Sequence, residues 1–441
     1  MAGDGAPEGA AEPAAEPPAV SLRTIAREWG RIGCLGFGGP PAHIALLRQL
    51  CVEDRGWLPA SEFEDGIAAC NLLPGPASTQ LAIFCAWRLR GTAGALIGGL
   101  CFILPGLVII LGLAAVFLAQ HPPGWIRGAA SGADAAVPAV AVAAAIGLAP
   151  ASWQRMTRSG TSVRAAHARW VGYTLAGGVA AATVGPWLVL VLAACGLAET
   201  AVTSRRARPD QPRPDRPRPA RPPPGQPPPG QPSPGQPSPG RPSPDRPSPG
   251  RGALLLPLAA VPVTGGLLAV AWVALKVGAL SYGGGFVIIP LMQHDAVHTY
   301  HWMTAAQFLD AVALGQVTPG PVVQTVAVVG YAAHGVAGGL LASAVAFAPS
   351  FLFVLGGGRY FDRLRGNVRV QAFLTGAGPA AIGAIAGAAI PLALALAHVW
   401  QFGLLALAAV WLIGLRRGVV SGIVGAAGLG VLAFLAGAPV G

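Results

Sequence analysis

Charged residues are scarce in this chain. Only 11% of its 441 residues are Asp, Glu, Lys or Arg, whereas soluble globular domains carry about 25%. Lysine is almost absent, since Lys276 is the only one in the sequence. This shortage of charge excludes an ordinary soluble domain. The 53% apolar residues and the 62 glycines instead indicate a lipid-embedded protein whose helices pack closely through glycine.

The sequence also lacks the motifs of common redox and hydrolytic enzymes. It has no flavin or dinucleotide fingerprint and no nucleophile elbow, and its six cysteines form no Cys-x-x-Cys pair. We interpret the cysteines as small packing residues, and we expect no cofactor and no metal site. A membrane enzyme is therefore the disfavoured alternative to a transporter.

The positive charge of the chain is concentrated in one segment. Residues 205–251 hold ten arginines and three aspartates, which accounts for most of the formal net charge of +11. The segment is rich in Pro, so a solvated cytoplasmic linker explains it better than a nucleic-acid-binding region, and we expect no nucleic-acid partner. Residues 1–20 have no apolar signal core and are predicted to be a disordered tail.

Long apolar stretches predict an all-α polytopic membrane protein. A helix needs about 20 apolar residues to cross a hydrocarbon layer of ~30 Å. With shorter stretches and broken helices included, we expect about ten to thirteen membrane segments. The stretches of sufficient length lie at 93–119, 129–150, 254–280, 336–357, 375–397 and 418–437.

The chain contains an internal repeat. Identical residues recur at a constant offset of 245 positions, which becomes 244 after a one-residue deletion. Trp57 matches Trp302 and a Pro-Gly-Pro triplet matches its copy, which chance similarity between apolar stretches would not keep in one register. The predicted domains are the tail at 1–20, a first transmembrane repeat at 21–203, the cytoplasmic linker at 204–252 and a second repeat at 253–441.

Arginine placement predicts that the two halves are inverted relative to each other. Short cytoplasmic loops retain Arg and Lys. In the first half, the loops near 48–55, 88–90 and 155–169 carry arginines, and the loop at 120–128 holds only Arg127. In the second half, the equivalents of the first three loops have no Arg or Lys, whereas the equivalent of the Arg127 loop has four arginines. Equivalent loops on opposite faces are a property of inverted-topology repeats.

Each half contains two predicted helix breaks, one rich in Gly and one a Pro-Gly-Pro triplet. Gly allows unusual backbone angles and Pro suits the first helical turn, so helices are expected to begin near residues 40, 76, 285 and 321. Helix N-termini facing a buried cavity would favour an anion, although packing kinks without a ligand are the alternative. The residues are Phe37, Gly38, Gly39 and Pro40 with Tyr282, Gly283, Gly284 and Gly285, and Pro74, Gly75 and Pro76 with Pro319, Gly320 and Pro321.

Two basic residues occupy equivalent apolar positions. Lys276 and its repeat partner Arg31 each lie seven residues before the first Gly of the first break. A cation inside an apolar segment is expensive, so we predict that both contribute charge to an anion site. The alternative is that both side chains extend to a membrane interface.

Polar and acidic residues near the second breaks complete the predicted site. Hydroxyl and amide donors on a first helical turn can bind an oxyanion without adding charge, or can simply cap the helix; the candidates are Ser78, Thr79, Gln80, Gln324 and Thr325. The matched acids Asp65 and Asp310 are candidates for coupling: either could pair with Arg31 or Lys276 in the empty site, or carry a proton. A solvated helix N-terminus is the alternative for Asp65.

The repeated motifs resemble those of the chromate ion transporter family in its long, two-domain form. The resemblance rests on Lys/Arg-x-Gly-x-x-x-Phe-Gly-Gly-Pro followed by Pro-Gly-Pro, and the second half departs from it at Tyr282 and Gly285. It covers nearly all of the chain outside the tail and the linker. It implies proton-driven export of chromate across a bacterial inner membrane, and hence chromate resistance, with sulfate or another tetrahedral oxyanion as the alternative substrate. We allow for a homodimer.

Overall fold

The computed structural model describes residues 20–71, 73, 75–119, 122–158, 162–183, 188–206, 266–281, 286–357 and 367–440. Met1–Thr203 and Val263–Gly441 form one compact unit, which contains both halves of the repeat, and Ser204–Pro262 form the other. The predicted tail and linker lie outside the described residues, apart from a few residues at their edges.

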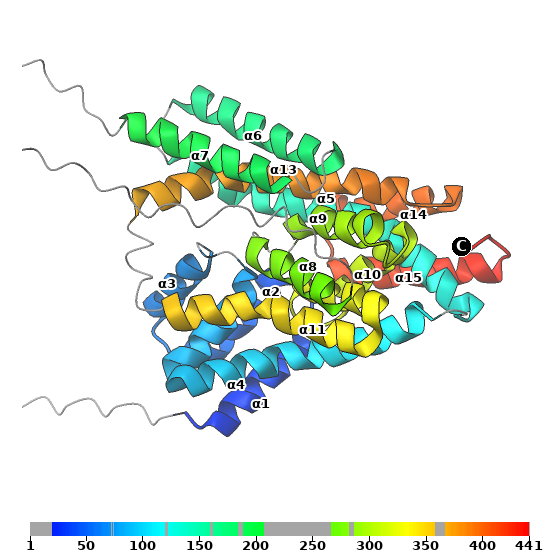
Figure 1. Cartoon of the computed structure of the whole chain (residues 1–441), viewed down its shortest axis with the longest axis horizontal. Helices are drawn as coiled ribbons and strands as arrows, with labels where there is room; N and C mark the ends of the chain where they lie inside the picture. The colour runs from blue at the N-terminus through cyan, green and yellow to red at the C-terminus, as the bar shows by residue number, and fades with distance from the viewer. Residues whose placement is uncertain are drawn as a thin grey trace, which may run out of the picture. The chain divides into compact units, whose positions relative to one another are not determined.

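The described residues form helices and contain no strand (Figure 1). The first half comprises α1 (Leu22–Leu35), α2 (Pro40–Arg48), the π-helix η1 (Gln49–Asp54), α3 (Ala60–Cys70), α4 (Ala77–Phe117), α5 (Gly124–Thr157), α6 (Val163–Thr183) and α7 (Leu188–Arg206). The second half comprises α8 (Leu267–Leu280), η3 (Phe286–Ile288), α9 (Ile289–Gln293), the π-helix η4 (His294–Thr299), α10 (Ala305–Val317), η5 (Val322–Gln324), α11 (Thr325–Gly357), α13 (Val368–Leu394), α14 (Val399–Ala409), η7 (Val410–Gly414) and α15 (Val419–Leu435).

Several of these helices are long and apolar enough to cross a membrane. Five meet both conditions among the described residues: α4, α5, α7, η5 continued by α11, and α13. Three shorter apolar helices occur at Leu267–Leu280, Val399–Gly414 and Val419–Leu435. The predicted all-α membrane architecture is therefore confirmed, while the number of crossings stays a prediction.

Helices α4 and α11 each double back on themselves. Arg90 and Gly91 interrupt α4, and His334 and Gly335 interrupt α11, with nearly equal φ angles of 55° and 58° at the two glycines. A Cβ built on Gly98 would lie 2.5 Å from the Cβ of Ala86. In a continuous helix these residues would be about 18 Å apart. Each element is therefore a hairpin with a short first arm and a long second arm.

The two halves share irregular backbone as well as sequence. The π-helices η1 and η4 begin and end at positions that the 245-residue offset makes equivalent. Gly56 and its equivalent His301 follow these π-helices, and both have left-handed φ angles, of 57° and 53°. Because π-helical segments are rare in proteins, their recurrence at matched positions confirms the repeat at the level of structure.

The two copies run in opposite directions. In the long arms of α4 and α11, a Cβ on Gly99 would lie 2.5 Å from the Phe351 ring, and a Cβ on Gly339 would lie 2.5 Å from Cδ2 of Leu111. As residue numbers rise along α4, the numbers of the α11 residues that contact it fall, so the two arms are antiparallel. They lie side by side in Figure 1. Equivalent helices that pack antiparallel are what inverted-topology repeats require.

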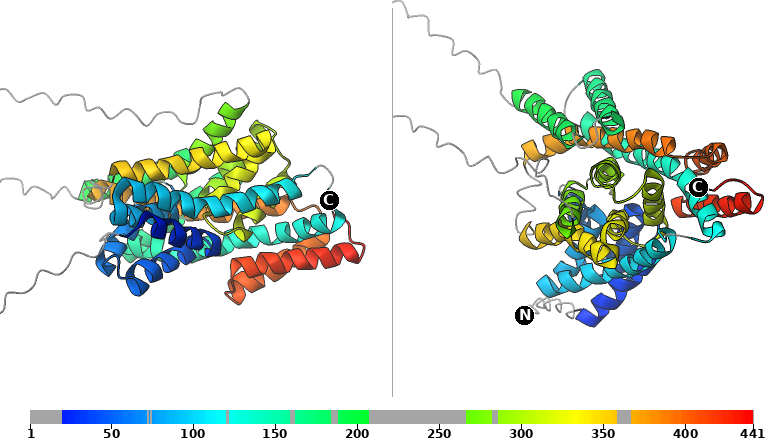
Figure 2. Two further views of the ribbon diagram at one scale, coloured as in Figure 1. Left: turned by 90° about the horizontal axis from the view of Figure 1, so that it is seen from below. Right: turned by 45° about the vertical axis from the view of Figure 1, so that its right-hand side comes forward.

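The halves also interlock through glycine contacts. Helix α15 of the second half packs on α5 of the first, where a Cβ on Gly132 would overlap the carbonyl oxygen of Ala426. Helix α6 of the first half packs on α13 of the second, where a Cβ on Gly177 would overlap the carbonyl oxygen of Ala380. Figure 2 shows the red α15 alongside the turquoise α5. Small residues allow this close approach in membranes, and the two halves form one body.

Candidate substrate site

The described residues of the two Pro-Gly-Pro breaks lie buried at contacts between the halves. The backbone N–H of Gly75 donates a hydrogen bond to the carbonyl of Ser281 at 2.7 Å, and the N–H of Gly320 donates to the carbonyl of Gly36 at 3.0 Å. Ser281 and Gly36 directly follow α8 and α1, where each first break begins. We call these contacts the Gly75–Ser281 junction and the Gly320–Gly36 junction. They are equivalent under the repeat, and each joins the second break of one half to the start of the first break of the other.

The backbone at the breaks agrees with the sequence prediction. Gly75 and Gly320 have φ angles of 121° and 105°, which residues with side chains rarely adopt. Helix α2 begins at Pro40, and Pro76 and Pro321 are the N-cap residues of α4 and η5. The fourth predicted start, near residue 285, is followed by η3 at Phe286. The expected helix starts are therefore confirmed.

Polar side chains on the helical turns after the second breaks are buried. Gln324 donates from Nε2 to the carbonyl of Ile103 at 2.6 Å, which ties η5 to the long arm of α4. Thr325 donates its hydroxyl to the carbonyl of Val322 at 2.8 Å, so this hydroxyl bonds within its own helical segment and does not cap a backbone N–H. Ser78, Thr79 and Gln80 are at most 1% exposed on the first turn of α4.

The first break of the N-terminal half is more open. Phe37 is 43% exposed and Gly38 is also exposed, whereas a Cβ on Gly39 would lie 3.6 Å from Cγ2 of Val322 at the start of η5. This break therefore borders the second half on one side only. Four predicted site residues, Pro74, Tyr282, Gly283 and Gly284, lie outside the described residues.

Lys276 is buried and paired with an acid that we did not predict. Its Nζ lies 2.5 Å from Oδ2 of Asp295 in η4, and the two side chains are 11% and 6% exposed. Nζ also lies 5.9 Å from the centre of the Trp272 ring. Of the two possibilities given for Asp65 and Asp310, pairing with this lysine is not the one that the structure shows, because Asp295 occupies that place.

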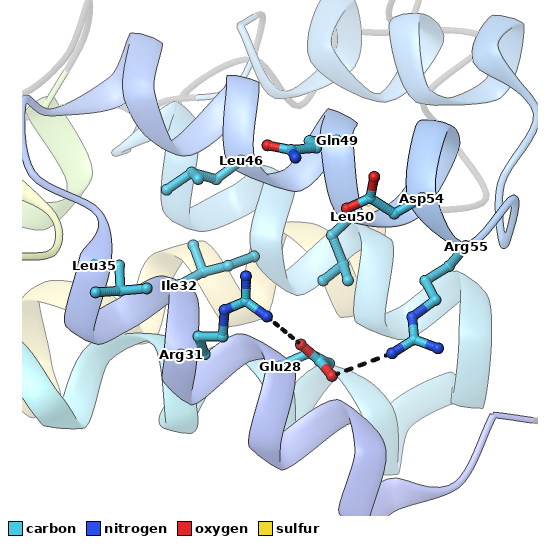
Figure 3. Close-up of a pocket in the computed structure, with 9 residues that line it drawn as sticks. All are labelled: Glu28, Arg31, Ile32, Leu35, Leu46, Gln49, Leu50, Asp54 and Arg55. Carbon is cyan, nitrogen blue, oxygen red and sulfur yellow. Dashed lines mark ion pairs between the residues drawn. The ribbon is translucent and has the colours of Figure 1, made fainter.

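Arg31 occupies a different environment from Lys276. Its side chain is 71% exposed and lies 3.8 Å from Glu28, whose side chain is 6% exposed and also contacts Arg27 and Arg55. Figure 3 shows Arg31 and Arg55 reaching Glu28 from two sides, in a surface pocket of about 100 Å³. Arg31 therefore fits the interface alternative, and its expected pairing with Asp65 or Asp310 is replaced by a pairing with Glu28.

The two predicted coupling acids also differ. Asp65 is exposed on α3, as the alternative of a solvated helix allowed. Asp310 on α10 borders an apolar cavity of about 140 Å³, and its carboxyl group lies within hydrogen-bonding reach of Asp134 on α5. Asp134 is 6% exposed. Asp310 thus lies beside a second acid from the other half, which the repeat did not predict, and a coupling role for Asp65 or Asp310 stays a prediction.

Comparisons with known proteins agree with this architecture. The model of the chromate transporter family matches residues 23–199 and 268–433, one region in each half. The chain belongs to the chromate transporter family. A chromate transport protein of Cupriavidus metallidurans is 30% identical over 387 residues, which cover 85% of this chain and 84% of that protein. A probable chromate transport protein of Synechococcus elongatus is 28% identical over 380 residues, which cover 85% of each chain.

A more distant relative is not named for chromate. An uncharacterized transporter of Methanocaldococcus jannaschii is 24% identical over 355 residues, which cover 79% of this chain and 78% of that protein. No solved structure matches the chain. Membership of the chromate transporter family makes this an integral membrane transporter with an oxyanion as the implied substrate.

Besides Asp295, sequence reasoning missed four further buried residues of this chromate transporter family member. Ser281 and Ser350 have fully buried side chains, His43 lies within 2.8 Å of the Gly36 carbonyl through Nε2, and Asp134 faces Asp310. At the repeat offset their partners are Gly36, Gly106, Ile288 and Gly378. A search for matched polar pairs passes over such residues, whereas a search for polar residues opposite glycine or an aliphatic residue would have found all four.

Proposed function

We propose that this protein exports chromate from the cytoplasm by secondary active transport, driven by the proton gradient across a bacterial plasma membrane, and so confers chromate resistance. The observation that carries the proposal is the pair of buried junctions between inverted halves, in a chain of the chromate transporter family. Helix α4 begins at one junction, and the positive end of a helix favours an anion. Two relatives named for chromate transport support the choice of ion.

Sulfate is the second candidate substrate. Sulfate and chromate are both tetrahedral dianions, so hydrogen-bond donors arranged around one would also suit the other. Competition between the two ions is therefore part of the test.

We assign proton coupling to Asp310 together with Asp134. Two carboxylates within hydrogen-bonding reach repel each other, and a proton held between them removes the repulsion. The pair joins α5 of the first half to α10 of the second, so a movement between the halves changes the distance between its members. An ionisable residue within a membrane bundle is by default a functional candidate. Asp65 is exposed and receives no such role.

The test is uptake of radiolabelled chromate into inverted vesicles. Their lumen corresponds to the outside of the cell, so we expect an acidic lumen to accelerate uptake and a protonophore to abolish the acceleration. Asp310→Asn is expected to remove the response to the pH gradient, whereas the matched variant Asp65→Asn keeps it. If chromate uptake by the wild type does not change with the pH gradient, proton coupling is refuted. Transport of sulfate but not chromate would make the alternative substrate the correct one.

A further inference from the structure

The two junctions have the same backbone but different side chains. At the Gly75–Ser281 junction, the second half supplies Ser281 and, from the long arm of α11, Ser350. The repeat equivalents of these two serines at the other junction are Gly36 and Gly106. The fold therefore forms a junction without either hydroxyl, which means that packing alone does not require them.

Both serine hydroxyls are buried without a hydrogen-bond partner. Ser281 and Ser350 are 0% exposed, and within the described part of the chain the Oγ atom of each has no partner. The same is true of the hydroxyl of Thr79, on the first turn of α4. Burying a hydroxyl without a hydrogen-bond partner is unfavourable. Three such hydroxyls around one helix start therefore indicate hydrogen-bond donors for a ligand that is not part of the chain.

The position of Ser350 places its hydroxyl at the junction. A Cβ built on Gly75 would lie 3.2 Å from Oγ of Ser350 and 2.5 Å from Nε2 of Gln80. Ser350 thus points at the glycine whose N–H bonds to Ser281. The second half brings the hydroxyls, and the first half brings the start of α4.

The Gly320–Gly36 junction is filled by the protein's own atoms. A Cβ on Gly36 would lie 2.5 Å from Cδ2 of His43, and one on Gly106 would overlap the carbonyl oxygen of Pro319. The carbonyl of Gly36 also lies within hydrogen-bonding distance of His43 Nε2. This junction has no room for a side chain at either glycine, so only the Gly75–Ser281 junction presents free hydroxyls.

We infer that the Gly75–Ser281 junction is the oxyanion subsite, with the hydroxyls of Ser281, Ser350 and Thr79 donating hydrogen bonds to a tetrahedral dianion. The inference rests on the proposed function and adds to it the residues that recognise the ion. The positive end of α4 lies beside these donors and supplies favourable potential for an anion. Because Thr79 belongs to one half and the serines to the other, the bound ion holds the halves together and is released when the junction opens.

The experiment compares Ser281→Ala and Ser350→Ala, singly and together, with Ser343→Ala in the full-length protein. Ser343 is a matched control, because it lies on the same helix as Ser350 and is 2% exposed. The readouts are KM for chromate in vesicles and the shift in melting temperature that chromate causes in purified protein. Each lost hydrogen bond to an ion is expected to raise KM about tenfold, and the double variant to raise it about a hundredfold.

Without ligand, the double variant is expected to melt no lower than the wild type, because each substitution removes a buried hydroxyl that has no hydrogen-bond partner among the described residues. A KM within about twofold of wild type in the double variant, or an equal effect of Ser343→Ala, overturns the subsite. Molybdate, sulfate and phosphate are measured in parallel. Loss of their binding in the double variant supports the subsite even if chromate is not the ion transported, whereas a wild type that binds none of the four ions overturns both proposals.

Discussion

The buried ion pair between Lys276 and Asp295 offers a direct test of the packing around the site. Its atoms are 2.5 Å apart and its side chains are only 11% and 6% exposed, so little water is available to solvate either charge alone. Lys276→Met removes the cation and leaves the carboxylate buried. Breaking a buried pair in this way costs about 3–5 kcal/mol, whereas replacing both partners with neutral residues costs far less.

The equivalent position in the first half supplies the control. Arg31 is 71% exposed, and Glu28 keeps Arg27 at 2.8 Å and Arg55 at 3.7 Å when Arg31 is removed. Exposed pairs contribute about 0–1 kcal/mol. Arg31→Met is therefore expected to leave stability nearly unchanged, although the two cations occupy matched positions in the repeat.

The assay is the melting temperature of the purified protein in detergent, followed by chromate uptake in vesicles. Lys276→Met is expected to lower the melting temperature by on the order of 5 °C, and adding Asp295→Asn should recover most of that loss. A Lys276→Met protein that melts like the wild type, or a double variant no better than the single one, would refute the reasoning. If the double variant is stable but does not transport chromate, the lysine charge also acts on the ion.

Two further predictions address topology and helix packing. In a cysteine-free background, Arg90→Cys and His334→Cys should react with a membrane-impermeant maleimide from opposite faces of the membrane. The reason is that the turns that they occupy are equivalent in the two inverted copies, and labelling of both from one face would contradict the inversion. Gly278→Ala should lower the free energy of unfolding by about 1–3 kcal/mol, since its Cβ would overlap the carbonyl oxygen of Ala346. The control Gly112→Ala should leave stability unchanged, because a Cβ there would meet nothing within 4 Å, and equal melting temperatures of the two variants would contradict the close packing.

Features set by local backbone chemistry could be predicted from the sequence. Pro76 and Pro321 mark helix starts because proline suits a first turn, and Gly75 and Gly320 adopt backbone angles that other residues avoid. Because the sequence repeats, a helix start predicted in one half was supported by the same motif at the equivalent position in the other half. Loop arginines predicted the inversion, which the antiparallel arms of α4 and α11 reproduce.

Contacts between the halves could not be predicted in the same way. The equivalent of Asp295 is Leu50 and that of Asp134 is Gly378, so repeat matching gives no sign that either acid is important. Whether Lys276 reaches Asp295 depends on how α8 packs against η4, which hydrophobic periodicity does not determine. For the same reason Arg31 and Lys276, which look alike in the sequence, differ in exposure and in partner.

On these proposals, the chemistry of this transporter is concentrated where the two halves depart from the repeat. An inverted repeat gives two conformations of similar backbone energy, because exchanging the roles of the halves exchanges one conformation for the other. If the side chains were also identical, both junctions would bind the same ligand equally well and neither half would be distinguished. Ser281 and Ser350 opposite Gly36 and Gly106 confine free hydroxyls to one junction, and Asp134 opposite Gly378 confines the acid pair to one side of the interface. On this view the shared backbone supplies the movement, and the unmatched side chains determine where the anion and the proton bind.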